Sequence, residues 1–344
     1  MRIFLLPENG TFYKANLHCH STLSDGSWTV EEIKENYKAH GYAAVAFTDH
    51  DVFIPHNDLS DGSFIALNGY EIAITDRSDP LAGSPRTCHF CLIATDKDRT
   101  AQRIYYKSRY LEQHREKIDI PADSEITTTE YSPEFISRLM TEARNDGFFV
   151  TYNHPVWSLE TRDQYCNYHG MHAMEIVNNS CVSEGYYEHN EGIYDDMLIS
   201  GEKGLFCIST DDNHDRHPID SPKCDSFGGF TMIKADKLEY GAITQALIDG
   251  SMYASEGPEI YELYFEDGYV HIKTSDAVKI IMSTDKRHRR IALSETRGGT
   301  INKACFHVEK RLGNYIRFTV FDREGKMANT HAYYMDTLPI ADED

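Results

Sequence analysis

The chain carries two histidines one residue apart, His18 and His20, at the end of the apolar run TFYKANLHCH. On a β-strand, residues i and i+2 project from the same face, so both imidazoles can reach one metal ion. Asp25 follows in a Ser-Asp-Gly loop. Imidazole and carboxylate together are ligands that suit zinc, manganese and iron. This first motif therefore predicts metal chemistry.

Similar polar residues recur at the ends of later strand-like runs. The nine candidate metal ligands are His18, His20, Asp25, His50, Glu71, His89, His154, Asp212 and His214. Each one alone has an ordinary explanation, such as a hydrogen-bonded structural histidine, a turn aspartate or an ion-paired glutamate. Buried ionisable groups are unfavourable without partners. Six apolar runs that each deliver such a group to one rim therefore favour a shared metal centre.

The elements that would position these ligands are short apolar runs alternating with helical patterns. The strands are expected at 11–18, 43–48, 64–74, 88–94, 148–153, 172–178, 204–210 and 228–234. The helices are expected at 29–40, 101–118, 132–146, 191–201 and 241–250. This alternation predicts parallel strands with crossover helices, in a barrel or an open sheet. In such barrels the active site lies at the C-terminal ends of the strands.

The pattern changes near Gly257-Pro258, after which alternating runs are separated by Asp-Gly, Gly-Gly and Gly-Asn turns. This spacing is typical of a small antiparallel sandwich. We therefore expect two domains, a metal-binding barrel over residues 1–257 and a β-sandwich over 258–344. The charged, Tyr-rich segment 95–131 lies inside the first domain. A solvated surface helix is favoured there over a helix inserted above the barrel mouth.

Composition excludes several classes of function. The 344 residues include 34 Lys and Arg against 55 Asp and Glu, a net charge of −21. Such a chain repels polyanions, which argues against duplex nucleic acid as a partner but not against a small phosphorylated molecule. No apolar stretch approaches the roughly 20 residues of a membrane span. The eight scattered cysteines and the short apolar run of MRIFLLPENG predict reduced thiols and a cytoplasmic location. The sequence is compatible with an oligomer and does not specify the oligomeric state.

The ordered series HxH, TDHD, strand Glu, strand His, NHP and DxH resembles the PHP (polymerase and histidinol phosphatase) superfamily over about residues 11–257. The resemblance implies an α/β fold, a distorted (βα)7 barrel with a centre of two or three metals, followed here by the sandwich. Within the superfamily, the chain resembles the branch that includes carbaryl-hydrolase-type metallohydrolases. The signatures that carry this resemblance are YNHPVWS, AMEIVNN, DSFGGF and YASEGPEIYEL. Many trinuclear members have His where this chain has Asp25 and others have Asp there, a difference that bears on the occupancy or identity of the third metal.

The same resemblance implies three metal subsites. The first subsite would consist of His18, His20, Glu71 and Asp212. The second would share Glu71 and add His89 and His154, and the third would consist of Asp25, His50 and His214. Asp49, Asp51 and Asp211 would orient the ligands' ring nitrogens or cap loops.

The function that fits best is a metal-dependent hydrolase, a phosphoesterase for a phosphomonoester or phosphodiester of a small molecule or nucleotide. Its cofactors would be two or three divalent ions (Mn, Zn or Fe) that share a hydroxide nucleophile. Arg162, Arg216 and His217 are candidates for contacts to the phosphate, and His217 for protonating the leaving group; for both arginines a surface role is slightly favoured. One alternative is hydrolysis of an ester, amide or carbamate at the same site. A second is a non-catalytic, metal-binding regulatory protein.

Overall fold

The computed structural model describes residues 2–79, 83–124, 130–201 and 203–340. The strands of the α/β part are β2 (Thr11–Asn16), β3 (Ala44–Phe47), β4 (Ile65–Thr75), β5 (Thr87–Ala94), β6 (Phe148–Asn153), β7 (Ala173–Asn178), β8 (Phe206–Thr210), β9 (Phe230–Ala235) and β10 (Met252–Ser255). Its helices are α1 (Val30–Ala39), α2 (Arg109–Gln113), α3 (Pro133–Asn145), α4 (Arg162–Tyr165), α5 (Asn179–Ser183), α6 (Glu191–Ser200) and α7 (Tyr240–Ile248).

The sheet of this part is only partly parallel. The pairs β2–β3, β3–β4, β6–β7 and β7–β8 are parallel, but β5 is antiparallel to both β4 and β6. Strand β9 is antiparallel to β2 and β10. The prediction of parallel strands is therefore wrong at β5 and β9, and β10 was not among the predicted strands. A closed barrel is not confirmed, because no backbone ladder joins β8 to β9 among the described residues.

The reversal of β5 matters for the site. Because β5 runs opposite to its neighbours, its first residues lie at the same sheet edge as the end of β6. His89, near the start of β5, pairs directly with Asn153 at the end of β6. A ligand at the beginning of one strand thus meets ligands that follow the ends of the others.

Local sequence signals set two helix starts as predicted. Thr29 forms a capping box, in which its hydroxyl accepts from the Glu32 N–H and the Glu32 carboxylate accepts from the Thr29 N–H. Such a box satisfies two otherwise unpaired donors. Ser132 caps α3, with Pro133 in its first turn.

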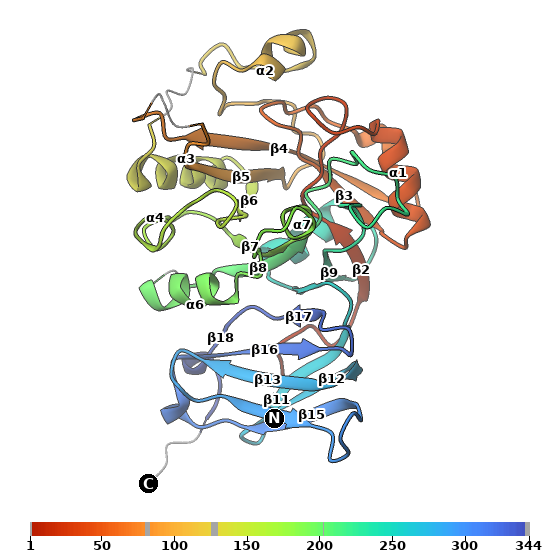
Figure 1. Cartoon of the computed structure of the whole chain (residues 1–344), viewed down its shortest axis with the longest axis vertical. Coiled ribbons are helices and arrows are strands. Elements are labelled where there is room, and N and C mark those ends of the chain that lie inside the picture. Colours follow the sequence, from red (N-terminus) through yellow and green to blue (C-terminus); the bar gives the residue numbers. More distant parts are fainter. Residues whose placement is uncertain (1, 80–82, 125–129, 202, 341–344) are drawn as a thin grey trace.

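The helix predicted over 101–118 is wrong. Ser108 caps α2 through the Leu111 N–H, so helix begins only at residue 109 and ends at 113. Before it, the buried Gln102 side chain accepts from the Phe53 N–H at 2.8 Å and donates to the Asp51 carbonyl at 2.8 Å. These bonds tie the segment to the loop after β3 in an extended path. Figure 1 shows α2 projecting beyond β4 at the top of the view.

The C-terminal part is built from strands in two sheets. Its strands are β11 (Ile260–Glu266), β12 (Tyr269–Ala277), β13 (Lys279–Thr284), β14 (Arg290–Leu293), β15 (Ile301–His307), β16 (Tyr315–Phe321), β17 (Met327–Asn329) and β18 (Tyr333–Tyr334). Buried side chains from both sheets, among them Ile272, Phe306 and Phe318, form one core, as expected for a β-sandwich.

The two parts are joined through the backbone. Strand β17 pairs with β10, so β13, β14, β16 and β17 continue the large sheet, while β11, β12 and β15 form the second one. A strand near the chain's start, β1 (Ile3–Phe4), pairs with β11, and Figure 1 shows the N-terminus among the sandwich strands. The domain boundary at 257/258 stays a prediction.

A buried ion pair also connects the sandwich to the α/β part. Arg317 on β16, 3% exposed, donates from Nε and NH2 to the two carboxylate oxygens of Asp195 on α6, both at 2.8 Å. The Tyr315 hydroxyl donates to the same carboxylate at 2.9 Å.

None of the helices in the described part of the chain has the length and apolarity that a membrane crossing requires.

Candidate metal centre

The structure brings all nine predicted ligands to one edge of the large sheet. They come from the segments after β2, β3, β6 and β8 and from within β4 and β5. The segments are linked by short backbone bridges, including Cys19 with Asn213 and His50 with Glu71. Two of the ligands, His154 and Asp212, have φ angles of 26° and 51°. Strained backbone of this kind is often found at functional sites.

The first predicted group is close enough to surround one ion. The Nε2 atoms of His18 and His20 are 3.1 Å apart. Asp212 Oδ1 lies 3.2 Å from the first and 3.0 Å from the second, and Glu71 Oε1 lies 3.3 Å from His18 Nε2. Donor atoms bound tetrahedrally at about 2.1 Å to one ion would be roughly 3.4 Å apart. The spacing therefore fits a single ion.

The second group faces the same Glu71 oxygen, Oε1, that lies near His18. This oxygen is 3.1 Å from His89 Nδ1 and 3.4 Å from His154 Nε2. The indole of Trp157 packs edge-on against both of these imidazoles, with ring centroids 5.4 and 5.1 Å away. Trp157 was not predicted, and it walls this side of the centre.

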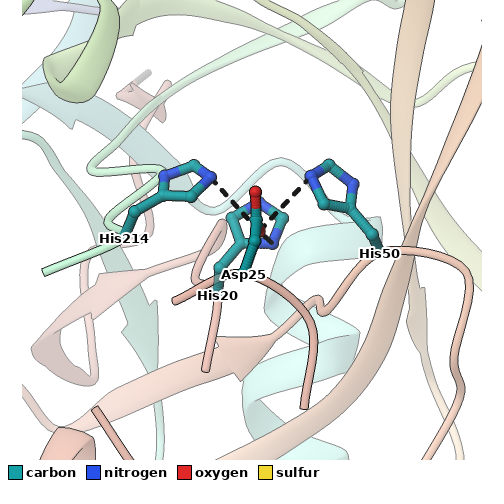
Figure 2. A group of neighbouring side chains, drawn as sticks. All are labelled: His20, Asp25, His50 and His214. Atoms are coloured by element: carbon teal, nitrogen blue, oxygen red, sulfur yellow. Dashed lines mark ion pairs between the residues drawn. The ribbon is translucent and has the colours of Figure 1, made fainter. Parts of the chain in front are cut away.

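The third group surrounds Asp25, which follows the first histidine pair in sequence. Figure 2 shows the Asp25 carboxylate between His50 and His214, with His20 beside it. Its Oδ1 is 3.6 Å from His50 Nε2, 3.5 Å from His214 Nε2 and 3.8 Å from His20 Nδ1. Gly26 allows this loop to fold tightly, because a Cβ there would lie 2.3 Å from the His20 carbonyl oxygen.

Hydrogen bonds outside the centre fix the orientation of several ligand rings. The Nδ1 atom of His18 donates to Glu175 Oε1 at 2.7 Å, and that of His214 donates to the Asp212 carbonyl at 2.9 Å. His154 Nδ1 contacts the Ser158 hydroxyl at 3.2 Å. Each of these contacts leaves Nε2 facing the centre, and the two bonds donated to oxygen acceptors, from His18 and His214, place a proton on Nδ1.

Glu175 on β7 contacts the candidate ligands His18 and His154 and was not among the predicted site residues. Its fully buried carboxylate also accepts from the His154 N–H at 3.0 Å, the Asn178 amide at 2.9 Å and the Thr210 hydroxyl at 2.7 Å. The available signal was a single acidic residue within the otherwise uncharged run AMEIVN, the same signal that singled out Glu71.

We expect Glu175→Ala to weaken metal binding about 10- to 100-fold, the usual effect of removing a residue that orients a ligand. Titration of the chelator-treated protein with Zn²⁺ or Mn²⁺ measures the affinity. Glu175→Gln is the matched control, because its amide oxygen can still accept from His18 and should preserve more of the affinity. Wild-type affinity in the alanine variant would contradict this role.

The remaining carboxylates and amides near the centre support the ligands. Asn153 donates to Glu71 Oε1 at 3.2 Å, and Asn178 donates to Asp212 Oδ2 at 3.0 Å. Asp49 accepts from the backbone and hydroxyl of Ser21, both at 2.8 Å. Asp211 accepts from three backbone N–H groups of residues 227–229. Both aspartates thus cap loops, one of the two roles considered for them.

The electrostatics of the residues present fit divalent cations. Asp25 Oδ1, Glu71 Oε2 and Asp212 Oδ1 are buried without a hydrogen bond, an unfavourable arrangement unless another positive partner is supplied. Although burial opposes ionisation, the facing imidazoles hold the pKa of Glu71 well below its usual range. Burial and the neighbouring His50 and His214 lower the pKa of His20 to about 4. Anionic carboxylates and neutral imidazoles are the forms that bind metal.

Metal affinity should rise with pH. Burial lowers the pKa of His50 and His154, but facing carboxylates, above all Glu71, outweigh it and raise both to about 9. Below pH 9 both rings carry a proton in the metal-free chain, and an ion must displace it. We expect weaker binding at pH 6 than at pH 8, with proton release. Calorimetric titration in two buffers of different ionisation enthalpy measures the protons, and a pH-independent affinity would contradict the expectation.

The three other predicted site residues are placed differently. Arg216 lines the cavity at the centre, which has a volume of about 150 Å³, and its NH2 lies 3.2 Å from Asp25 Oδ2. His217 lines only the adjoining groove. The structure does not bring Arg162 to the centre, because its guanidinium, 58% exposed, pairs with Asp196 on α6 at 3.2 Å.

Comparisons with known proteins identify the family of the chain. The model of the PHP domain family matches residues 16–248, whereas no curated protein matches the chain. A two-domain protein from Bacteroides vulgatus containing a predicted PHP-like metal-dependent phosphoesterase is similar in structure, at 16% identity over 96% of this chain and 98% of that one, with a TM-score of 0.42.

Two further solved structures are similar over a smaller part of the chain. A provisionally assigned metal-dependent phosphoesterase from Bifidobacterium adolescentis shares 14% identity over 63% of this chain and 91% of its own, with a TM-score of 0.37. An amidohydrolase from Chromobacterium violaceum, with bound sulfate and no metal, shares 16% identity over 58% and 87%, with a TM-score of 0.32. Since the family model covers more than half of the 344 residues, the chain belongs to the PHP domain family.

Proposed function

We propose that the chain is a metal-dependent phosphoesterase that hydrolyses a phosphomonoester or phosphodiester of a small molecule or nucleotide. The observation that carries the proposal is the close approach of the candidate donor atoms. His18 and His20 each belong to two groups whose donor atoms lie within 4.8 Å of one another, and the Glu71 carboxylate lies within 3.5 Å of five imidazoles. The proposal includes two or three ions of Mn, Zn or Fe, bound by the nine residues named above. It also includes a distorted (βα)7 barrel over 1–257 and a sandwich over 258–344.

The bound ions would lower the pKa of water and offset the negative charge of the phosphoryl oxygens. The chain's own contribution is to hold the ligand atoms of His18, His20 and Asp212 within 3.2 Å of one another. Arg216 adds a fixed positive charge at the cavity wall, where it can stabilise charge that develops on a phosphoryl group. Trp157 lines the cavity on the side of His89 and His154.

Metal-reconstituted protein should be tested on 4-nitrophenyl phosphate, bis(4-nitrophenyl) phosphate and 4-nitrophenyl acetate, together with elemental analysis of protein purified without chelator. We expect bound divalent metal and turnover of at least one of the two phosphoesters. Turnover of the acetate alone would replace the proposal with a carboxylic-ester, amide or carbamate hydrolase. Bound metal without turnover of any substrate would favour a regulatory protein.

The two arginines should respond differently to replacement. Arg216→Ala is expected to lower kcat/KM for the phosphoester about tenfold or more, because it removes a charge-assisted contact at the cavity. Arg162→Ala should leave kcat/KM within about twofold, since an exposed ion pair contributes little and lies away from the centre. Steady-state kinetics of the two variants checks this, and equal losses would contradict the assignment.

A further inference from the structure

The cavity at the metal centre continues on one side into a groove of about 390 Å³. The two share Ser180, Glu184, His214 and Arg216 in their walls. The groove is further lined by Ser183, Tyr186, His217, Lys223 and Asp225. A group attached to a phosphoryl at the metal centre can therefore extend into this groove.

The opposite side of the centre is covered by the segment around α2. The Tyr110 ring stacks on His50, with centroids 6.0 Å apart and planes 19° apart. His114 Nε2 donates to the Leu23 carbonyl at 2.8 Å and so fixes the end of α2 to the Asp25 loop. Together with Trp157 on the side of His89, this cover leaves the groove as the space for the leaving group of a substrate.

The charges in the groove favour an anion. Lys223 and His217 are exposed, and their side-chain nitrogens make no hydrogen bond or ion pair with the described residues. Of the two carboxylates, that of Asp225 already accepts from the backbone N–H groups of His214 at 2.7 Å and Asp215 at 3.2 Å. Among the described residues that line the groove, only Glu184 presents an exposed carboxylate near Lys223.

We propose that the substrate carries a second anionic group, a phosphate or a carboxylate, on its leaving group, and that Lys223 and His217 bind it. This inference rests on the proposed hydrolytic function and specifies its substrate class. An ammonium and an imidazole at the groove wall recognise either anion as point charges and hydrogen-bond donors. In a chain with a net charge of −21, an ammonium without an ion pair among the described residues also guides an anionic leaving group to this side of the centre.

The test uses two probes that differ in one charge, 4-carboxyphenyl phosphate and 4-carbamoylphenyl phosphate. With metal-loaded wild-type protein we expect kcat/KM to be about tenfold higher for the carboxylated probe, mainly because its KM is lower. A factor of about ten is the effect expected from one additional charge-assisted hydrogen bond. Lys223→Ala should remove most of this preference, and Glu184→Gln should increase it. Lys237→Ala is the matched control, because Lys237 is an exposed lysine already paired with Glu239 at 2.5 Å.

A binding measurement separates this inference from the proposed chemistry. Calorimetry of (4-carboxybenzyl)phosphonate and (4-carbamoylbenzyl)phosphonate with metal-loaded protein needs no turnover and should show the same preference and the same loss in Lys223→Ala. If only the corresponding acetate esters are hydrolysed, the phosphoesterase proposal fails, while a Lys223-dependent preference for the carboxylated ester retains this inference. Equal binding of the two phosphonates, or a preference unchanged in Lys223→Ala, would overturn it.

Discussion

Glu71→Ala is expected to lower kcat/KM by about a thousandfold or more. The two oxygens of Glu71 lie within 3.5 Å of nitrogens of His18, His20, His50, His89 and His154. Removal of an outer residue that only orients a ligand costs about 10- to 100-fold. Loss of a carboxylate that joins the ligand groups should cost more. Steady-state kinetics together with elemental analysis should show both turnover and bound metal reduced.

The matched control for this variant is Glu160→Gln. Glu160 is also buried, but its carboxylate accepts from the hydroxyls of Tyr131, Tyr152 and Tyr168, none of which is a predicted ligand. We expect this variant to keep its metal, and circular dichroism should show both variants folded. Wild-type rates in a folded Glu71→Ala protein would refute the role of Glu71 in the centre.

Arg317→Ala is expected to lower the free energy of unfolding by about 3–5 kcal/mol, the usual effect of leaving one charge of a buried pair without its partner. Asp195 would keep only the Tyr315 hydroxyl and the more distant guanidinium of Arg289, 3.6 Å away. Because this pair connects α6 to β16, the loss should affect the whole molecule. Urea unfolding followed by fluorescence measures the change.

Two further variants distinguish the ion pair from general damage. Lys273→Ala removes one partner of an exposed pair with Glu262, 3.4 Å long, and should cost less than about 1 kcal/mol. Asp195→Leu combined with Arg317→Met leaves no buried charge unpaired and should be less destabilised than Arg317→Ala. A double variant that is less stable than the single one would show that the charges themselves are not the cause.

The sequence was sufficient to predict most elements and to single out nine side chains that meet at one sheet edge, because both depend on local patterns. Apolar runs of strand length and helix caps such as Thr29 with Glu32 are local, and ligands placed at strand ends meet once the strands form a sheet. The direction of a strand relative to its neighbours, in contrast, does not depend on a local sequence pattern. The run TCHFCLIA of β5 is buried throughout and has the same side-chain pattern whether it runs parallel or antiparallel to its neighbours.

Residues whose role depends on tertiary contacts were harder to predict. Arg162 follows the NHP loop closely in sequence, but α4 directs it to Asp196 on α6. Tyr110 belongs to a charged segment whose composition suits a solvated helix, yet it stacks on His50 because Gln102 holds the segment against the loop after β3. Neither contact is encoded in the spacing of nearby residues.

The pairing of β1 with β11 bears on how the protein is made. The ribosome releases Ile3 and Phe4 long before Ile260–Glu266, so the donors and acceptors of β1 must remain solvated while the intervening α/β part is synthesised. An amino-terminal fusion partner would consequently sit next to a sheet that can form only after residues 260–307 have been synthesised, so interference from it would affect a late step of folding.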